Sequence, residues 1–210
     1  MPYLFTRTTR LASGGPDSLG WAMNVTEKVN MIGELRVSLW ARMFSAELGS
    51  ITWSTVVDDM AEIITGDEKL DADSGFVELV AQGAQYSAGT GLDDNLIQLI
   101  NADSVTADPQ FTMVTVAVLA PGKAAEGIAL GLELCELGKE VTGAETLFGT
   151  AVTGVFGQVV WISLHESLDE MQAGGEALAA NPSWIEMIDK RTPTAYMPGS
   201  GQRWISRKVM

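Results

Sequence analysis

The sequence aligns with itself at a shift of 108 residues without gaps, and this repeat restricts the fold more than any other feature. Over positions 3–102, 14 residues are identical to the residue 108 positions later, and eight of these identities lie in 49–80. Trp53 falls on Trp161 and Glu62 on Glu170. A period of this length is too long for a solenoid repeat. We therefore expect a duplicated small domain, with repeats at 1–102 and 111–210 and a linker at 103–110.

Both repeats predict the same order of elements, β-α-β-β-α-β, which is the ferredoxin-like unit of an α+β fold. Residues rich in Thr, Val and Phe favour strands, and Gly, Pro and Asp mark the starts of helices. The expected helices include 14–33 and 122–140. The expected strands lie at 3–10, 35–44, 49–54 and 94–101 in the first repeat, and at 111–119, 144–152, 157–162 and 202–209 in the second.

The chain's single histidine, His165, lies beside a possible helix start. Ser163-x-x-Glu166 has the spacing of a capping box, and Thr55-x-x-Asp58 has a similar spacing in the first repeat. This interpretation places His165 in the first turn of a helix. The alternative is a functional one, in which a neutral imidazole at this point acts as a base or a ligand, so His165 is the candidate catalytic residue.

Composition excludes several classes of function. The formal net charge is −14, which disfavours binding to nucleic acid and to anionic membranes. One cysteine and one histidine cannot form the common zinc sites or an intramolecular disulfide, and we expect no metal. No apolar run is long enough for a membrane helix, and the N-terminal residues lack the pattern of a signal peptide. A reducing cytoplasm fits this composition.

The pattern W-x-S-x-x-E at 161–166, an amphipathic helix, and N-P-x-W-x-E at 181–186 together resemble the dimeric α/β-barrel superfamily. The most similar branches are the NIPSNAP-like and antibiotic-biosynthesis-monooxygenase-like domains. The resemblance covers about a third of each repeat. It implies that two antiparallel sheets pair into one barrel with the helices outside, and that further self-association into a homo-oligomer is compatible with the fold. Known activities in the superfamily include cofactor-free oxygenation and haem binding or degradation.

Strand alternation predicts a ligand site in the first repeat. If Val37, Leu39, Ile51 and Trp53 face the helices, a polar set faces the barrel interior. We therefore expect a small, largely apolar ligand. A more specific hypothesis is that the ligand is an anion whose carboxylate is bound by two arginines. The predicted ligand-binding residues are Arg36, Ser38, Trp40, Arg42, Thr52 and Ser54.

Several functions remain open at this point. The chain binds a small molecule without a cofactor, or serves as a scaffold in an assembly, or is a monooxygenase of the α/β-barrel type. A haem-linked member of that group would need His165 as its axial ligand. The Met1-Pro2 start also resembles the tautomerases, which use an N-terminal proline as a base, but Gln110 occupies the matching place in the second repeat.

Overall fold

The computed structural model describes residues 1–12, 16–45, 47–89, 91–102 and 108–210. Their contacts divide the chain into two compact units. The N-terminal unit contains Pro2–Leu96 together with Arg207–Met210, and the C-terminal unit contains Ile97–Ser206 together with Met1. The first part of the predicted linker, 103–107, lies outside the described residues.

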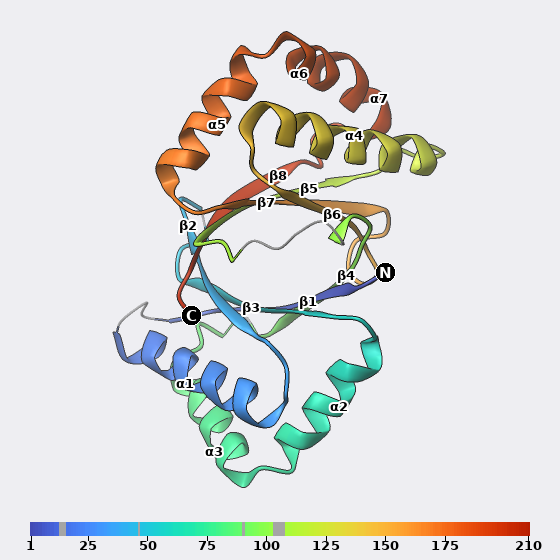
Figure 1. The fold of residues 1–210 in the computed structure, drawn as a ribbon. Coiled ribbons are helices and arrows are strands. Elements are labelled where there is room, and N and C mark those ends of the chain that lie inside the picture. The colour runs from blue at the N-terminus through green and yellow to red at the C-terminus, as the bar shows by residue number, and fades with distance from the viewer. Residues whose placement is uncertain (13–15, 46, 90, 103–107) are drawn as a thin grey trace. The chain divides into compact units, whose positions relative to one another are not determined.

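The N-terminal unit combines strands with helices on one of their faces (Figure 1). Its elements are β1 (Tyr3–Arg10), α1 (Pro16–Ile32), β2 (Ser38–Met43), β3 (Ser50–Val57), α2 (Met60–Asp71), α3 (Ser74–Gln82), the short 3₁₀ turn η1 (Gly83–Gln85) and the first part of β4 (Asp93–Leu99). β3 is the middle strand, since it pairs antiparallel with both β1 and β2.

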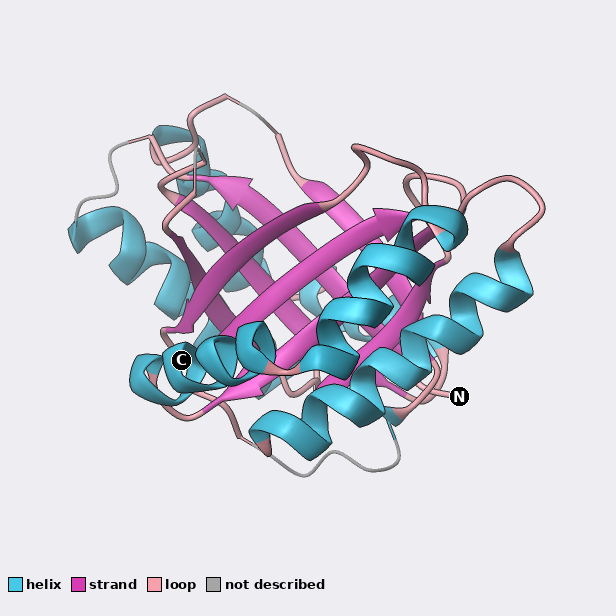
Figure 2. Ribbon diagram, turned by 90° about the horizontal axis from the view of Figure 1, so that it is seen from above, coloured by secondary structure: helices cyan, strands magenta, loops and turns pink. Residues whose placement is uncertain are grey.

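The C-terminal unit repeats this plan, and its helices again cover one face of its strands (Figures 1 and 2). Its elements are the last part of β4, β5 (Phe111–Val118), α4 (Ala124–Thr142), β6 (Thr146–Ala151), β7 (Gln158–His165), α5 (Leu168–Ala180), α6 (Pro182–Glu186), the π-helical turn η3 (Met187–Arg191), α7 (Thr192–Ala195) and the first part of β8 (Gln202–Lys208). β7 pairs antiparallel with β5 and β6.

The boundaries of the elements follow the repeat seen in the sequence. Adding 108 to the bounds of β1, β2 and β3 gives the bounds of β5, β6 and β7, and α2 and α5 also begin 108 residues apart. The hydrogen-bonded strand order is β1-β3-β2-β8-β5-β7-β6-β4, and the antiparallel sheet is closed. Within this order each repeat keeps the same sequence of strands, β4-β1-β3-β2 and β8-β5-β7-β6. The predicted α+β fold of two ferredoxin-like repeats is confirmed.

The core of the N-terminal unit lies between its strands and α1. Leu39, Ile51 and Trp53 are buried there against Ala22 and Val25 of the helix. Val37 packs on the edge of the same cluster. The predicted helix-facing set is therefore confirmed, and the alternating residues of β2 and β3 lie on the other face of the sheet.

The core of the C-terminal unit is built at the corresponding positions. Phe148 and Val159 are fully buried against Leu130 and Leu134 of α4. Cys135 belongs to the same cluster, and burial raises the pKa of its thiol to about 12. A thiol in this environment is a packing group and not a nucleophile.

Candidate functional site

A cavity of about 730 Å³ lies within the C-terminal unit, between the strands and helices α4 to α7. Its floor is formed by residues of β5, β7 and β8, and its walls by α4, α5 and α6. Ligand pockets of soluble proteins commonly measure roughly 300–1,000 Å³. The cavity is thus large enough for a small organic molecule.

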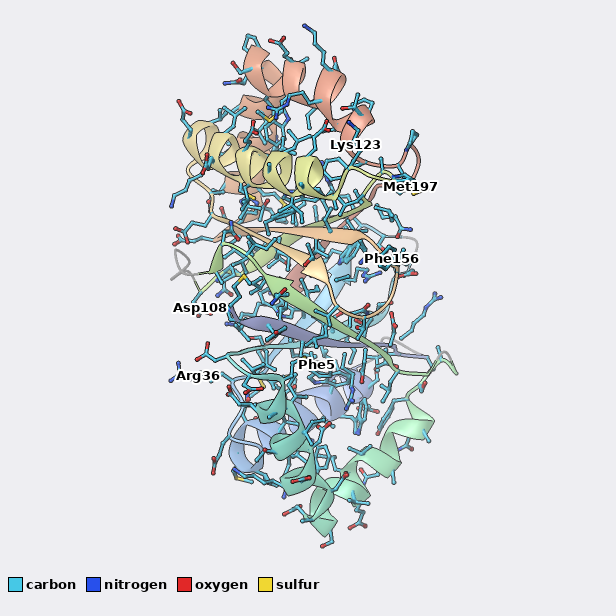
Figure 3. All side chains as sticks on the ribbon, turned by 90° about the vertical axis from the view of Figure 1, so that its right-hand side faces the viewer. Phe5, Arg36, Asp108, Lys123, Phe156 and Met197 are labelled. Carbon is cyan, nitrogen blue, oxygen red and sulfur yellow. The ribbon has the colours of Figure 1, made fainter. Side chains whose placement is uncertain are left out.

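The walls of the cavity are mainly apolar. The strands contribute Met113 and Trp161, and the helices contribute apolar side chains from the sides that face the sheet. These helical residues are Leu134, Met171, Leu178, Trp184 and Ile188. Met197, at the turn after α7, also lines the cavity and lies at the periphery of the unit (Figure 3).

Glycines in the two covering helices leave the space open. A Cβ added to Gly138 of α4 would meet only Trp184, at 3.9 Å, and one added to Gly175 of α5 would have no neighbour within 4 Å. Both glycines line the cavity. A glycine in a helix interior costs stability of about 1 kcal/mol relative to alanine. These two positions therefore keep a void at some cost to the helices.

The aromatic residues at one end of the cavity are held by α4. The Trp161 indole donates to the backbone oxygen of Gly131 at 3.1 Å, and the Tyr196 hydroxyl donates to that of Gly127 at 2.6 Å. The two rings meet edge to face with centroids 5.3 Å apart. Burial raises the pKa of Tyr196 well above its ordinary value. The phenol is therefore a neutral, fixed part of the wall.

His165 ends β7 and faces the cavity from the same side of the strand as Trp161. The side chain is 7% exposed, and its Nδ1 atom is buried without a hydrogen-bond partner among the described residues. The nearest carboxylate oxygen recorded for it, Oε1 of Glu170, is 3.9 Å away. Burial lowers the pKa of the imidazole, and Glu170 raises it in part. The imidazole is accordingly neutral near pH 7.

The predicted helix start at Ser163 is wrong. β7 continues to His165, which pairs with Phe111 of β5, and the Ser163 hydroxyl lies 3.0 Å from that of Thr146 on β6. Strand pairing therefore extends through the proposed capping box.

The helix begins four residues later than predicted, with Ser167 as its N-cap in place of Ser163. Ser167 caps α5 by accepting from the amide of Glu170, and Asp59 with Glu62 forms the corresponding capping box in the N-terminal unit. The predicted start at Thr55 is wrong for the same reason, since β3 extends to Val57.

Arg203 also lines the cavity, at a different position along the strands from His165. Its Nε atom donates to Thr115 Oγ1 at 2.9 Å. Eight of the chain's 13 basic residues form ion pairs with Asp or Glu, and Arg203 has no carboxylate partner within the described ranges. The remaining N–H groups of this guanidinium are available to a ligand at the rim of the cavity.

The ligand-binding residues predicted in the first repeat are only partly brought together. Trp40 donates its indole N–H to Ser54 Oγ at 2.8 Å, and Thr52 Oγ1 lies 2.9 Å from Thr8 Oγ1, so these side chains bond across the strands. Ser38 is the first residue of β2. Arg42 forms an ion pair with Glu47, and burial lowers its pKa.

Arg36, the other predicted anion-binding arginine, does not lie on a strand. It belongs to the segment before β2, is exposed, and lies at the edge of the N-terminal unit (Figure 3). The predicted strand at 35–44 begins instead at Ser38, because Asn30 of α1 bonds the backbone N–H and C=O of Val37 through its side chain.

The positions that line the cavity carry different chemistry in the N-terminal unit. Thr115 corresponds to Arg7, which forms a bidentate ion pair with Asp94 at 2.8 Å and lies over the ring of Phe5. His165 corresponds to Val57. The duplicated fold therefore places the unpartnered imidazole in one repeat only.

Strand alternation alone did not find this cavity, because it was applied to the interior face of the first repeat. A signal for it does exist in the sequence. Gly138, Gly174 and Gly175 interrupt helical segments that otherwise carry Leu, Met and Ala. Glycines on the sheet-facing side of a helix leave volume beneath it.

Some alternatives have no support in the described residues. No cluster of three or more His, Cys, Asp or Glu side chains suitable for a metal ion occurs in the described part of the chain. In that same part, no helix has the length and apolar character that crossing a membrane requires. Pro2 lies just before β1 and does not line the cavity described above.

The burial of His165 predicts a pH dependence of stability. Its pKa is lower in the folded chain than in the unfolded chain, so the unfolded state binds more protons below about pH 6.5. The stability that depends on neutral His165 is therefore complete above about pH 6.5 and is lost as the pH falls toward the folded pKa. We expect the wild type to lose more free energy of unfolding than His165→Gln between about pH 7.5 and about pH 5.

Urea unfolding at the two pH values measures this difference. Glu170→Gln removes the charge that partly raises the pKa of His165, and should enlarge the pH effect. Parallel pH curves for the wild type and His165→Gln would contradict the assignment.

Comparison with solved structures places the fold among known proteins. A candidate monooxygenase from Fusobacterium nucleatum matches with a TM-score of 0.73 at 12% identity, over 100% of this chain and 93% of its own. An anthrone oxidase-like protein matches with a TM-score of 0.66 at 13% identity, over 100% and 92%. A haem-binding protein from Thermus thermophilus matches with a TM-score of 0.58 at 8% identity, over 100% and 91%. These likenesses span the full chain and show a shared fold.

Sequence comparison adds nothing to this assignment. No protein-family model matches the chain, and no curated protein matches it. The functional argument therefore depends on the residues of the cavity.

Proposed function

We propose that this chain, which has the dimeric α/β-barrel fold in duplicated form, binds a small and largely apolar organic anion in the cavity of its C-terminal unit. The observation that carries the proposal is the cavity itself, with apolar walls and few polar groups. Sites of this composition bury most of a ligand's surface and orient it through one or two polar contacts.

The preference for an anion comes from Arg203. The formal net charge of −14 repels anions from most of the surface, and most cations are already paired with carboxylates. Arg203 lines the cavity, and among the described residues its hydrogen-bond partner is Thr115 Oγ1 alone. A guanidinium whose two terminal NH2 groups have no protein partner in the described part of the molecule suits a carboxylate or a similar planar anion.

Filling the cavity tests the proposal. Gly138→Leu places an isobutyl group in the space in front of Trp184, and the variant should bind biphenyl-4-carboxylate and decanoate at least about tenfold more weakly than the wild type. Isothermal titration calorimetry measures the change. Gly20→Leu is the matched control, because Gly20 is also a helical glycine with nothing within 4 Å but lies in α1.

The outcomes are distinct. Both variants replace a helical glycine, so both should keep or raise the free energy of unfolding. Loss of binding in Gly138→Leu alone supports the cavity as the site. Equal binding by the two variants, or no binding of either anion by the wild type, would reject it.

An oxygenase is the second candidate, and the position of His165 favours it. A neutral imidazole inside an apolar cavity can accept a proton from a weakly acidic ligand. Oxygen uptake in the presence of 1,4-dihydroxynaphthalene, measured on the wild type and on His165→Gln, separates an oxygenase from a binding protein.

Haem fits these residues less well than a smaller anion does. His165 offers an imidazole, but Arg203 is the one lysine or arginine among the described lining residues, whereas haem carries two propionates. We therefore keep haem outside the proposed function.

A further inference from the structure

Most polar groups that line the cavity are already hydrogen-bonded within the protein. Thr142 and Thr192 donate to backbone oxygens one turn earlier, and Ser163 bonds with Thr146. The polar atoms of Trp161 and Tyr196 bind to α4. A ligand gains little from these groups, because their hydrogen bonds would have to be broken first.

Two lining side chains, Arg203 and His165, keep unused hydrogen-bonding capacity. Arg203 has N–H donors beyond the one given to Thr115. His165 has a buried Nδ1 without a partner in the described part of the chain, and Glu170 at 3.9 Å is beyond hydrogen-bonding distance. Leaving a buried polar atom unpaired costs free energy, and His165 lines the cavity, so this imidazole points to a ligand group that pairs with it.

The strand register separates these two side chains. Arg203 bonds Thr115, which lies opposite Trp161 on β7, and His165 lies opposite Phe111. From Trp161 to His165 is four residues along β7, or about 13 Å at about 3.3 Å per residue. A ligand that bonds both side chains must therefore carry its two polar groups at opposite ends of an extended body.

We infer that the ligand is an elongated, largely apolar molecule with an anionic group bound by Arg203 at one end and a hydroxyl bound by His165 at the other. This inference depends on the proposed binding function and specifies its ligand class. The surfaces between the two ends are Met113, Trp161 and Trp184, which suit flat aromatic rings or an extended alkyl chain. The two ends then determine orientation, and the walls supply affinity.

Three rigid probes test the two ends separately. They are 4′-hydroxybiphenyl-4-carboxylate, biphenyl-4-carboxylate, which lacks the hydroxyl, and 4-phenylphenol, which lacks the carboxylate. On the wild type, the first probe should bind at least about fivefold more tightly than either of the others, since each end adds one hydrogen bond inside an apolar site.

Variants assign each end to its residue. Arg203→Gln should weaken both carboxylates about tenfold and leave 4-phenylphenol unchanged. His165→Leu should weaken the two hydroxylated probes and leave biphenyl-4-carboxylate unchanged. Because the chain has one histidine, the imidazole nitrogen signals of the 15N-labelled wild type report this contact without any substitution. They should shift with the hydroxylated probes only.

The results distinguish this inference from the proposal on which it depends. If none of the three probes binds, the binding function itself fails. If biphenyl-4-carboxylate binds and the added hydroxyl changes neither the affinity nor the imidazole signals, the cavity binds apolar anions but the two-ended ligand is wrong. If Arg203→Gln leaves the carboxylates unaffected, the anionic end is misassigned and the inference is overturned.

Discussion

Trp53→Ala is expected to lower the free energy of unfolding by about 3–5 kcal/mol. Trp53 is 7% exposed in the core of the N-terminal unit, and its ring meets that of Trp21 edge to face at 6.1 Å. Its indole N–H donates to the Thr26 hydroxyl at 2.9 Å, and Thr26 is itself fully buried. The substitution therefore removes a large apolar surface and a buried hydrogen bond together. Urea unfolding monitored by circular dichroism measures the loss.

Two further variants separate the contribution of the indole hydrogen bond from that of the packing of the ring. Thr26→Val removes the acceptor of the indole and keeps the ring, so we expect a loss of only about 1–2 kcal/mol. Trp161→Ala, at the corresponding position of the second repeat, should cost less than Trp53→Ala, because Trp161 borders the cavity and is less deeply buried than Trp53. A loss below about 1.5 kcal/mol for Trp53→Ala, or an equal loss at the two tryptophans, would contradict the packing described.

The second large effect is expected at a glycine. A Cβ on Gly131 of α4 would lie 2.3 Å from Cζ of Phe148, whose ring is fully buried between the helix and the sheet. The ring also packs against Trp161 at 5.1 Å between centroids, so a shift of the ring would disturb this contact as well. Gly131→Ala should therefore destabilise the protein by about 3 kcal/mol, even though alanine favours helices.

Gly20→Ala is the control for this substitution. Gly20 lies in α1 with nothing within 4 Å of the added methyl group, so the same change should stabilise the protein by about 0.5–1 kcal/mol. Thermal or urea unfolding of the two variants gives opposite signs if the close approach of α4 to the sheet is real. A neutral or stabilising Gly131→Ala would show that the helix lies farther from Phe148.

The repeat in the sequence predicted most of the fold. A gap-free register of 108 residues implies that corresponding elements recur at this spacing, and the bounds of β1, β2 and β3 and the start of α2 do so. Alternation along β2 and β3 also identified the side chains that pack on the helices, because one face of each sheet must be covered.

The ends of the elements were harder to predict. Two consecutive capping motifs, Ser163-x-x-Glu166 and Ser167-x-x-Glu170, satisfy the same local rule. Pairing of β7 with β5 out to Phe111 decides between them, and that contact joins residues more than 50 positions apart. The same pairing moves His165 from a helix turn to the end of a buried strand.

The candidate site, too, was only partly predictable from the sequence. Its residues come from strands β5 to β8 and from five helical segments, so their meeting depends on how closely the helices approach the sheet. Arg203 and His165 were visible in the sequence as a basic residue on a strand and as the only histidine. Nothing in their spacing indicated that they line one cavity.

The sequence by itself determined the duplication, the order of the elements and the faces that form the cores, because these follow from local periodicity and from a repeat that can be read directly. Tertiary structure alone decided where strands end, which cations remain without a carboxylate partner and where the cavity opens. These features depend on the distances between segments far apart in the chain, and a void beneath two helices is a property of packing that no single segment carries.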